Sequence, residues 1–93
     1  MNRADVYKAI DSERDYQERK WGNGATKKVH SLEEWCLYIQ DYLDEAKHAL
    51  SRKPDDVCYP IAKEIMRKIG GMAVKCMEEH GTTLRPADAE IVY

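Results

Sequence analysis

This sequence of 93 residues contains no phenylalanine, no long hydrophobic run and almost none of the alternation of apolar and polar residues that marks β-strands. No stretch approaches the roughly 20 apolar residues that a transmembrane helix needs. The first residues lack the apolar segment of a secretory signal, so we expect a cytoplasmic chain with no membrane partner. The composition, 43% hydrophobic and 34% charged, is typical of a globular, helix-rich protein.

Cysteine usage and net charge argue against further classes of protein. Cys36, Cys58 and Cys76 are odd in number and widely spaced, which favours reduced thiols over disulfides or a zinc site, and we expect Cys36 and Cys76 in the core. Fifteen basic and seventeen acidic residues give a net charge of −2, so the chain has no strong overall electrostatic field. We therefore expect no nucleic-acid partner.

Apolar residues recur at every third or fourth position and predict an all-α fold with helices at about 4–20, 32–51 and 57–80. Ser31 followed by Glu34 is a capping box that starts the second helix, and Gly81 ends the third. We expect residues 1–81 to form one domain, an antiparallel helical bundle, followed by a C-terminal tail (82–93) that can dock on a subunit. The expected core stripe of the second helix is Leu32, Trp35, Cys36, Ile39, Leu43, Ala46 and Leu50.

Three helices of this length make a thin bundle whose lateral surfaces need cover. We therefore expect a homo-oligomer that completes a four-helix or larger bundle. Gly70-Gly71 falls inside the third helix, where each glycine costs about 1 kcal/mol relative to alanine. The pair indicates a close helix crossing, a bend, or a ligand that approaches the backbone.

Polar residues continue the inward face of the first helix. Val6 and Ile10 define this face, and Glu13 and Gln17 follow on it. Either the helix leaves the core there and both side chains are solvated, or they line a pocket. In a pocket, a carboxylate and a carboxamide one turn apart can recognise a base or a ribose by hydrogen bonds.

Polar stripes also run along the other two helices. On the second helix the stripe consists of Glu34, Tyr38, Asp41, Glu45 and His48. It is either a solvent face or a source of the oxygen ligands that Mg²⁺ prefers. On the third helix, Glu64 and Lys68 form either a surface ion pair or a site at which the acid faces a metal and the lysine a phosphate.

Three segments together resemble small phage and prophage proteins of the MazG-like, all-α nucleotide pyrophosphatase group. They are residues 13–22 (ERDYQERKWG), 30–35 (HSLEEW) and 41–46 (DYLDEA). In that group, acidic pairs on two helices hold Mg²⁺ on a nucleoside triphosphate. Metal-activated water then splits the linkage between the α and β phosphates and releases a monophosphate and pyrophosphate.

The acidic pairs of the family are incomplete in this chain. In the first pair Glu45 matches and Tyr42 replaces the partner acid, and in the second Glu64 matches and Arg67 replaces it. The resemblance implies a magnesium site of Glu34, Asp41, Glu45 and Glu64, catalysis by Glu45 and Glu64, and nucleotide binding by Glu13, Gln17, Trp21, Tyr38, Tyr42, Arg67 and Lys68. A guanidinium in place of a carboxylate weakens cation binding and favours direct binding of phosphate.

Three functions are compatible with these residues. The first is magnesium-dependent hydrolysis of nucleoside triphosphates to monophosphate and pyrophosphate. The second is a non-catalytic phage protein that binds a nucleotide or a nucleotide-derived signalling molecule and so sequesters it from a host defence. The third is an oligomeric accessory protein without a small-molecule ligand.

Overall fold

The computed structural model describes residues 1–21, 29–51 and 57–86. These residues form three helices and no strand: α1 (Arg3–Trp21), α2 (Leu32–Ser51) and α3 (Cys58–His80). The predicted all-α fold class is confirmed, and each helix begins and ends within one residue of the expected position. Within the described segments, no helix has the length and apolar character needed to cross a membrane.

Hydrogen bonds between neighbours in sequence determine where the helices begin and end. The capping box of α2 is formed, because Ser31 Oγ accepts from the Glu34 amide at 3.1 Å and Glu34 Oε1 accepts from the Ser31 amide at 3.0 Å. Helix α3 ends at Gly81, whose φ of 85° suits glycine and whose amide donates to Met77 O at 2.7 Å. Asn2 Oδ1 accepts from the Asp5 amide at 2.8 Å at the start of α1.

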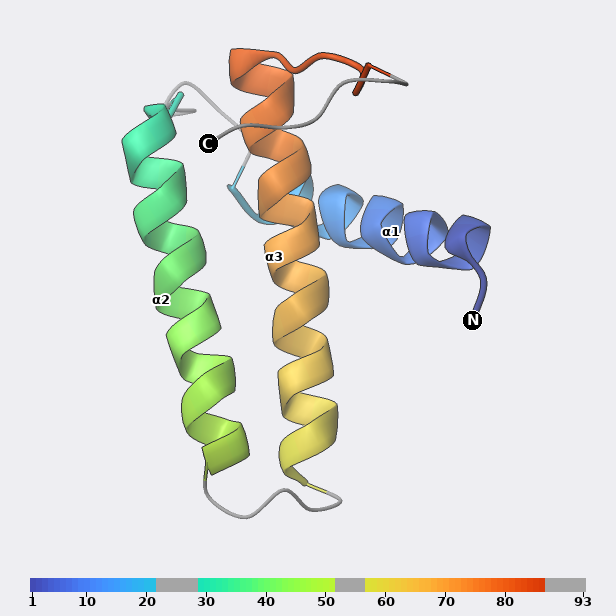
Figure 1. Ribbon diagram of the computed structural model, residues 1–93, viewed down its shortest axis with the longest axis vertical. Helices are drawn as coiled ribbons and strands as arrows, with labels where there is room; N and C mark the ends of the chain where they lie inside the picture. The colour runs from blue at the N-terminus through green and yellow to red at the C-terminus, as the bar shows by residue number, and fades with distance from the viewer. Residues whose placement is uncertain (22–28, 52–56, 87–93) are drawn as a thin grey trace.

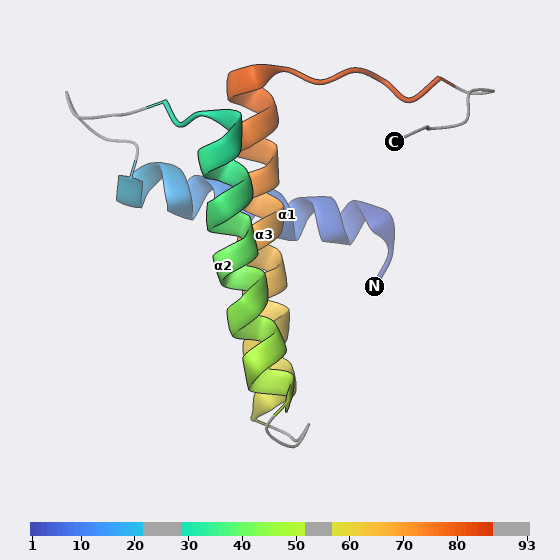
Figure 2. The same ribbon diagram turned by 60° about the vertical axis from the view of Figure 1, so that its left-hand side comes forward.

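Helices α2 and α3 lie side by side and antiparallel, whereas α1 crosses α3 instead of running alongside it (Figures 1 and 2). Of the described helices, α1 packs on α3 and does not contact α2. The radius of gyration is 15.4 Å, compared with about 12 Å for a compact chain of this length. The molecule is therefore open, and α3 is the element that both other helices share.

The apolar core lies between α2 and α3. It is built from Ala46, Ala62 and Ile65, with Tyr42, Leu50 and Ile69 packed against them, and Trp35 and Met72 are also buried. The expectation that Leu32, Cys36 and Leu43 belong to this core is wrong, since all three are exposed. Because α3 is the one described helix that packs on α2, only a narrow stripe of α2 is buried.

Gly70 and Gly71 lie at a close helix crossing, which is one of the three interpretations that the sequence left open for this pair. A Cβ atom on Gly71 would lie 2.8 Å from Nε2 of Gln17 and 3.0 Å from Cγ of Glu13. A Cβ atom on Gly70 would lie 3.3 Å from Cγ1 of Ile10, which is tight but tolerable. Glycine at 71 therefore lets the backbone of α3 approach the side chains of α1.

We expect Gly71→Ala to lower the free energy of unfolding relative to Gly70→Ala by about 1–3 kcal/mol, the usual range for an overpacked site. Both changes add the same helix propensity, about 1 kcal/mol in favour of alanine. Only the change at 71 drives a methyl group into the buried Gln17 side chain. Urea unfolding followed by circular dichroism measures the difference, and equal stabilities would contradict the close crossing.

Candidate functional site

Two polar side chains of α1 are buried at the crossing with α3. Glu13 is 5% exposed and Gln17 is 2% exposed, so the interpretation that both are solvated is wrong. Gln17 Nε2 donates to Lys68 O at 3.2 Å and to Glu13 Oε2 at 3.3 Å, while its Oε1 accepts from Arg14 Nη1 at 3.4 Å. Because one amide nitrogen serves two acceptors, its donor capacity is used within the protein.

Arg67 of α3 joins two carboxylates from different helices. Its Nε donates to Glu13 Oε1 at 2.9 Å, and its Nη1 donates to Glu64 Oε1 at 2.8 Å, with Nη2 bonded to the same carboxylate. Hydrogen bonds to Glu64 and then to Glu13 raise the pKa of Arg67 above its usual value. In return, the hydrogen bond from Arg67 lowers the pKa of Glu64. The pair of Arg67 and Glu64 is therefore ionised at neutral pH.

Charged side chains extend this network from the crossing to α2. Arg14 Nη2 lies 3.1 Å from Glu18 Oε2, and the same oxygen lies 3.8 Å from Lys75 Nζ of α3. Lys75 also lies 4.0 Å from Glu79, whose Oε1 accepts from Trp35 Nε1 of α2 at 2.7 Å. Polar contacts thus connect all three helices on one side of α3.

Aromatic rings gather at the start of α2. The ring centre of His30 lies 5.2 Å from that of Trp35 and 5.2 Å from that of Tyr38, both edge to face. His30 Nδ1 lies 3.6 Å from Glu34 Oε2. Tyr38, predicted to bind nucleotide, therefore belongs to this cluster, whereas Trp21 is exposed at the C-terminal end of α1.

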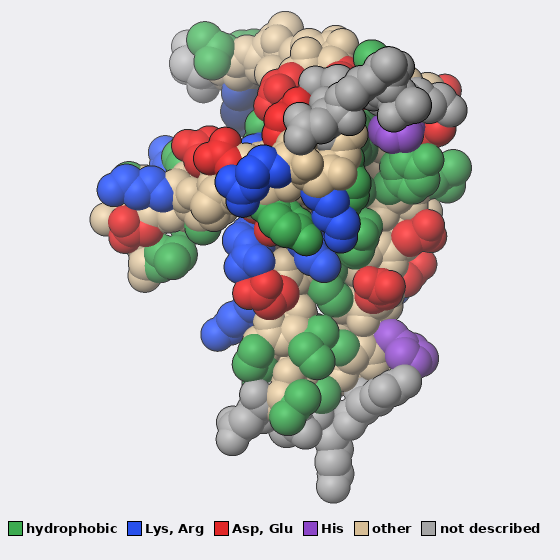
Figure 3. All heavy atoms as spheres, turned by 180° about the vertical axis from the view of Figure 1, so that it is seen from behind, with side chains coloured by type: hydrophobic (Ala, Val, Ile, Leu, Met, Phe, Trp, Pro, Cys, Tyr) green, Lys and Arg blue, Asp and Glu red, His purple; other side chains and the backbone are tan. Residues whose placement is uncertain are grey.

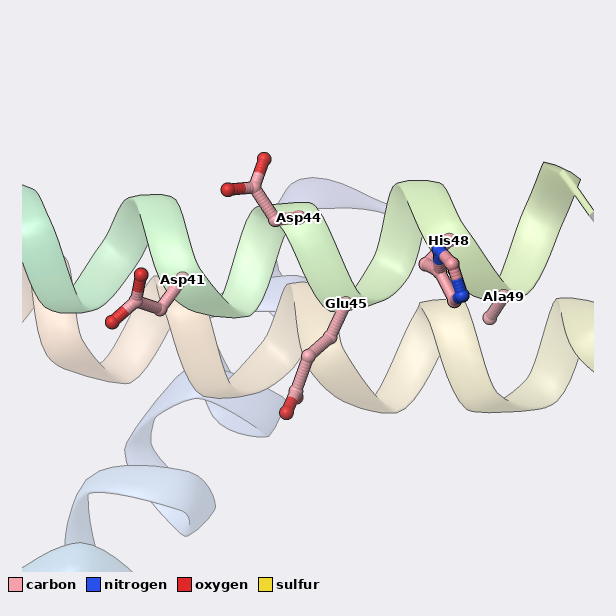
Figure 4. Close-up of a pocket in the computed structure, with 5 residues that line it drawn as sticks. All are labelled: Asp41, Asp44, Glu45, His48 and Ala49. Carbon is pink, nitrogen blue, oxygen red and sulfur yellow. The ribbon is translucent and has the colours of Figure 1, made fainter.

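A surface hollow of about 440 Å³ lies on α2 and includes two of the predicted metal ligands (Figure 4). Its described lining residues are Asp41, Asp44, Glu45, His48 and Ala49. Asp44 points away from Asp41 and Glu45, whose carboxylates lie apart on successive turns of the helix (Figure 4). The hollow is accordingly an acidic surface without convergent ligands.

The four predicted magnesium ligands do not gather at one point. Asp41 and Glu45 share the hollow, whereas Glu34 is held in the capping box and Glu64 is held by Arg67. Across residues 1–21, 29–51 and 57–86, no group of three or more histidine, cysteine or carboxylate side chains is placed to hold a metal ion. The residues present therefore fit a magnesium ion only in part, through Asp41 and Glu45.

Charge of opposite sign lies on the two neighbouring helices. Seen from the side on which α1 lies, acidic side chains follow α2 and basic side chains gather where α1 crosses α3 (Figure 3). Lys68 Nζ lies 5.8 Å from the ring centre of Tyr42, so the cation of α3 stands over an aromatic ring of α2. Two predicted nucleotide-binding residues thus meet between α2 and α3.

Sequence reasoning missed Arg14 and Glu79. Arg14 precedes Gln17 by three residues, and that spacing was a signal that the two share a face. Glu79 gave no such signal toward Trp35, because that partner lies on another helix. The thiols also differ from the expectation that both lie in the core, because Cys36 is exposed and Cys76 is half-buried. Partial burial raises the pKa of the Cys76 thiol, and Cys36 and Glu79 raise it further.

No protein-family model, no curated protein and no solved structure matches this chain. Of the predicted site residues, the fold brings Glu13, Gln17, Glu64 and Arg67 together at the crossing, Asp41 and Glu45 at the hollow, and Tyr42 and Lys68 between α2 and α3. Glu34 and Tyr38 lie at the start of α2, and Trp21 lies at the end of α1.

We expect Arg67→Ala to destabilise the fold by about 1–3 kcal/mol, because the buried carboxylate of Glu13 loses a charged hydrogen-bond partner. Glu64→Gln is the matched control, since it removes the exposed carboxylate of the same network and should cost less stability than Arg67→Ala. Chemical denaturation of both variants provides the comparison. An Arg67→Ala chain as stable as the wild type would show that Glu13 does not depend on this pair.

The pKa of the Glu64 carboxyl should lie below its usual value of 4.5 and return toward it in Arg67→Ala. Because the folded-state pKa is lowered, the contribution of this pair to stability is present above the unfolded-state pKa. It is lost as the pH falls through the folded-state pKa. Carbon-detected NMR titration of the side-chain carboxyl measures both values, and an unshifted titration in the wild type would contradict the hydrogen bonds to Arg67.

Proposed function

We propose that this chain binds a nucleotide or a nucleotide-derived small molecule and does not hydrolyse it. The observation that carries this proposal is the position of Arg67, whose guanidinium is bonded to Glu13 and Glu64. In the MazG-like group that the sequence resembles, an acid stands at this position and holds Mg²⁺. A cation there neutralises Glu64 and opposes the binding of a second cation.

Lys68 and Tyr42 support an anionic, aromatic ligand. A lysine ammonium attracts phosphate as a point charge, and a neighbouring ring offers a surface on which a base can stack. Lys68 is half-buried, with its ammonium 5.8 Å from the centre of the Tyr42 ring. Partial burial strengthens the attraction between this cation and an arriving phosphate, because water screens it less.

Sequestration of a signalling nucleotide is the biological role that this proposal favours. The resemblance is to phage and prophage proteins, and a phage gains from removing a nucleotide signal used by host defence. Such a protein needs affinity and no turnover. Loss of two of the four expected metal acids, at Tyr42 and Arg67, is consistent with that requirement.

Magnesium-dependent hydrolysis of nucleoside triphosphates to monophosphate and pyrophosphate is the second candidate function. Asp41 and Glu45 line one hollow on α2 and favour it. Mg²⁺ is often held by one or two carboxylates together with the phosphates of the substrate. Two acids are therefore enough to hold a metal that arrives with the nucleotide. Of these two, Glu45 is the one that matches an acid of the first acidic pair in the MazG-like group.

The two functions are separated by measuring binding and turnover on the same sample. We expect a panel of nucleoside triphosphates, monophosphates and cyclic dinucleotides to include a compound that raises the melting temperature without release of pyrophosphate in Mg²⁺. A ligand at 100 times its Kd adds about 2.7 kcal/mol to the stability of the native state. Pyrophosphate release that is lost in Glu45→Ala would overturn the proposal in favour of hydrolysis.

Lys68→Gln should weaken the binding of that compound by about tenfold, the effect of one charged contact of about 1.4 kcal/mol. Lys63→Gln is the matched control, because Lys63 is an exposed lysine of the same helix. Isothermal titration of both variants measures the affinities. Equal affinities would remove Lys68 from the site, and a panel without any binder would favour an accessory protein without ligand.

A further inference from the structure

The guanidinium of Arg67 has one buried and one exposed carboxylate partner. Its Nε donates to Glu13 Oε1 at 2.9 Å, and the Glu13 side chain is 5% exposed. Its two terminal nitrogens bond to Glu64, whose side chain is 58% exposed. The pair with Glu13 is therefore fixed inside the protein, whereas the pair with Glu64 faces solvent, where another anion can reach it.

The buried pair determines the direction in which the guanidinium points. Gln17 Nε2 donates to Glu13 Oε2 at 3.3 Å and to Lys68 O at 3.2 Å, so the carboxylate that receives Arg67 Nε is itself held in place. A guanidinium held at Nε presents its two terminal nitrogens as a fork. This fork matches the two oxygens of a carboxylate or of a phosphate. Helix α1 thereby prepares Arg67 to bind an anion from the solvent side.

A second cation acts on the same carboxylate. Arg67 and Lys68 follow Glu64 by three and four residues, so all three lie on one side of α3. The hydrogen bond from Arg67 lowers the pKa of the Glu64 carboxyl most, and the charges of Arg67 and Lys68 lower it further. The Lys68 ammonium lies over the ring of Tyr42, which carries no charge to neutralise it. The Glu64 carboxylate thus stands where two cations attract an anion.

The contact of Glu64 with Arg67 is of a kind that a stronger anion can replace. An exposed ion pair contributes little to stability, because water screens it and both side chains lose conformational freedom. A phosphate group carries more negative charge than a carboxylate and accepts the same two hydrogen bonds from a guanidinium. Basic side chains gather where α1 crosses α3, so this face attracts such an anion (Figure 3).

We infer that Glu64 occupies the phosphate position of the ligand site and that the phosphate of a bound ligand displaces it from Arg67. This inference rests on the proposed function and adds that Arg67 and Lys68 hold the phosphate. The displaced carboxylate turns into water, to which it is already largely exposed. Binding exchanges one anion for another, so Glu64 selects against ligands with a single negative charge and favours those with a phosphate dianion or a pyrophosphate.

Titration of Glu64→Gln with inorganic pyrophosphate in Mg²⁺-free buffer tests this inference, with the Arg67 side-chain N–H signals followed by NMR. Glutamine keeps the shape of glutamate and removes its charge. The variant should therefore bind pyrophosphate about fivefold more tightly than the wild type or better, the effect of removing one nearby negative charge that water partly screens. The Arg67 signals should shift on addition of pyrophosphate in both chains.

Glu33→Gln is the matched control. It removes the same charge from an exposed glutamate in the first turn of α2, beside the end of α3 that is remote from Glu64. It should bind pyrophosphate like the wild type.

A second variant separates the guanidinium fork from its charge. Arg67→Lys combined with Glu64→Gln keeps the positive charge at 67 and cannot donate two parallel hydrogen bonds to one anion. We expect it to lose most of the affinity gained in Glu64→Gln, with circular dichroism confirming that it is helical. A folded double variant that keeps the whole gain would show that the fork does not hold the phosphate.

Equal pyrophosphate affinities of Glu64→Gln and the wild type would overturn the inference, and so would a gain of the same size in Glu33→Gln or no binding to any of these chains. A nucleotide that binds the wild type and Glu64→Gln equally well would support the proposed function and still overturn this inference. Tighter pyrophosphate binding in Glu64→Gln, with no nucleotide of the panel bound by either chain, would uphold the phosphate position and overturn the proposed function.

Discussion

The position of α1 on α3 depends on the interlock of Glu13 and Gln17 with Gly71 and Arg67. A buried carboxylate is costly unless it is paired, and here Arg67 and the Gln17 amide both donate to Glu13. Gly71 supplies the space that these side chains occupy. The crossing is therefore held by directional polar contacts, which fix its register more sharply than apolar contact of the same extent.

The same interlock determines which charged groups face solvent around the candidate site. Arg67 uses its guanidinium on Glu13 and Glu64, so the acid expected to bind metal from α3 is neutralised inside the protein. Lys68 stands next to it, over the ring of Tyr42, and the acids of α2 remain on the other helix. Structure and site are thus linked: Arg67, which stands where the resemblance predicts a metal ligand, also holds α1 in place.

The direction of α1 also determines how much of α3 it covers. A helix that crosses α3 covers a short length of it, whereas a helix that ran alongside would cover several turns. The α2/α3 pair consequently keeps exposed apolar side chains on both helices, among them Leu32 and Cys36 of α2 and Tyr59 and Met77 of α3.

The sequence by itself determined the local features of this protein. Helix bounds follow from periodicity and from caps such as Ser31 with Glu34, because these bonds join residues three or four apart. Periodicity also placed Glu13 and Gln17 on the inward stripe of α1, although it left open whether that face was buried.

Only the tertiary structure decided which neighbour each face meets. Arg67 and Glu13 are separated by 54 positions in sequence, and nothing local indicates that they pair. In the same way, the exposure of Cys36 and Leu43 follows from the direction in which α1 leaves α3, so their apolar spacing alone placed them wrongly in the core. Periodicity defines a face of a helix, and packing between distant segments decides whether that face becomes core, site or interface.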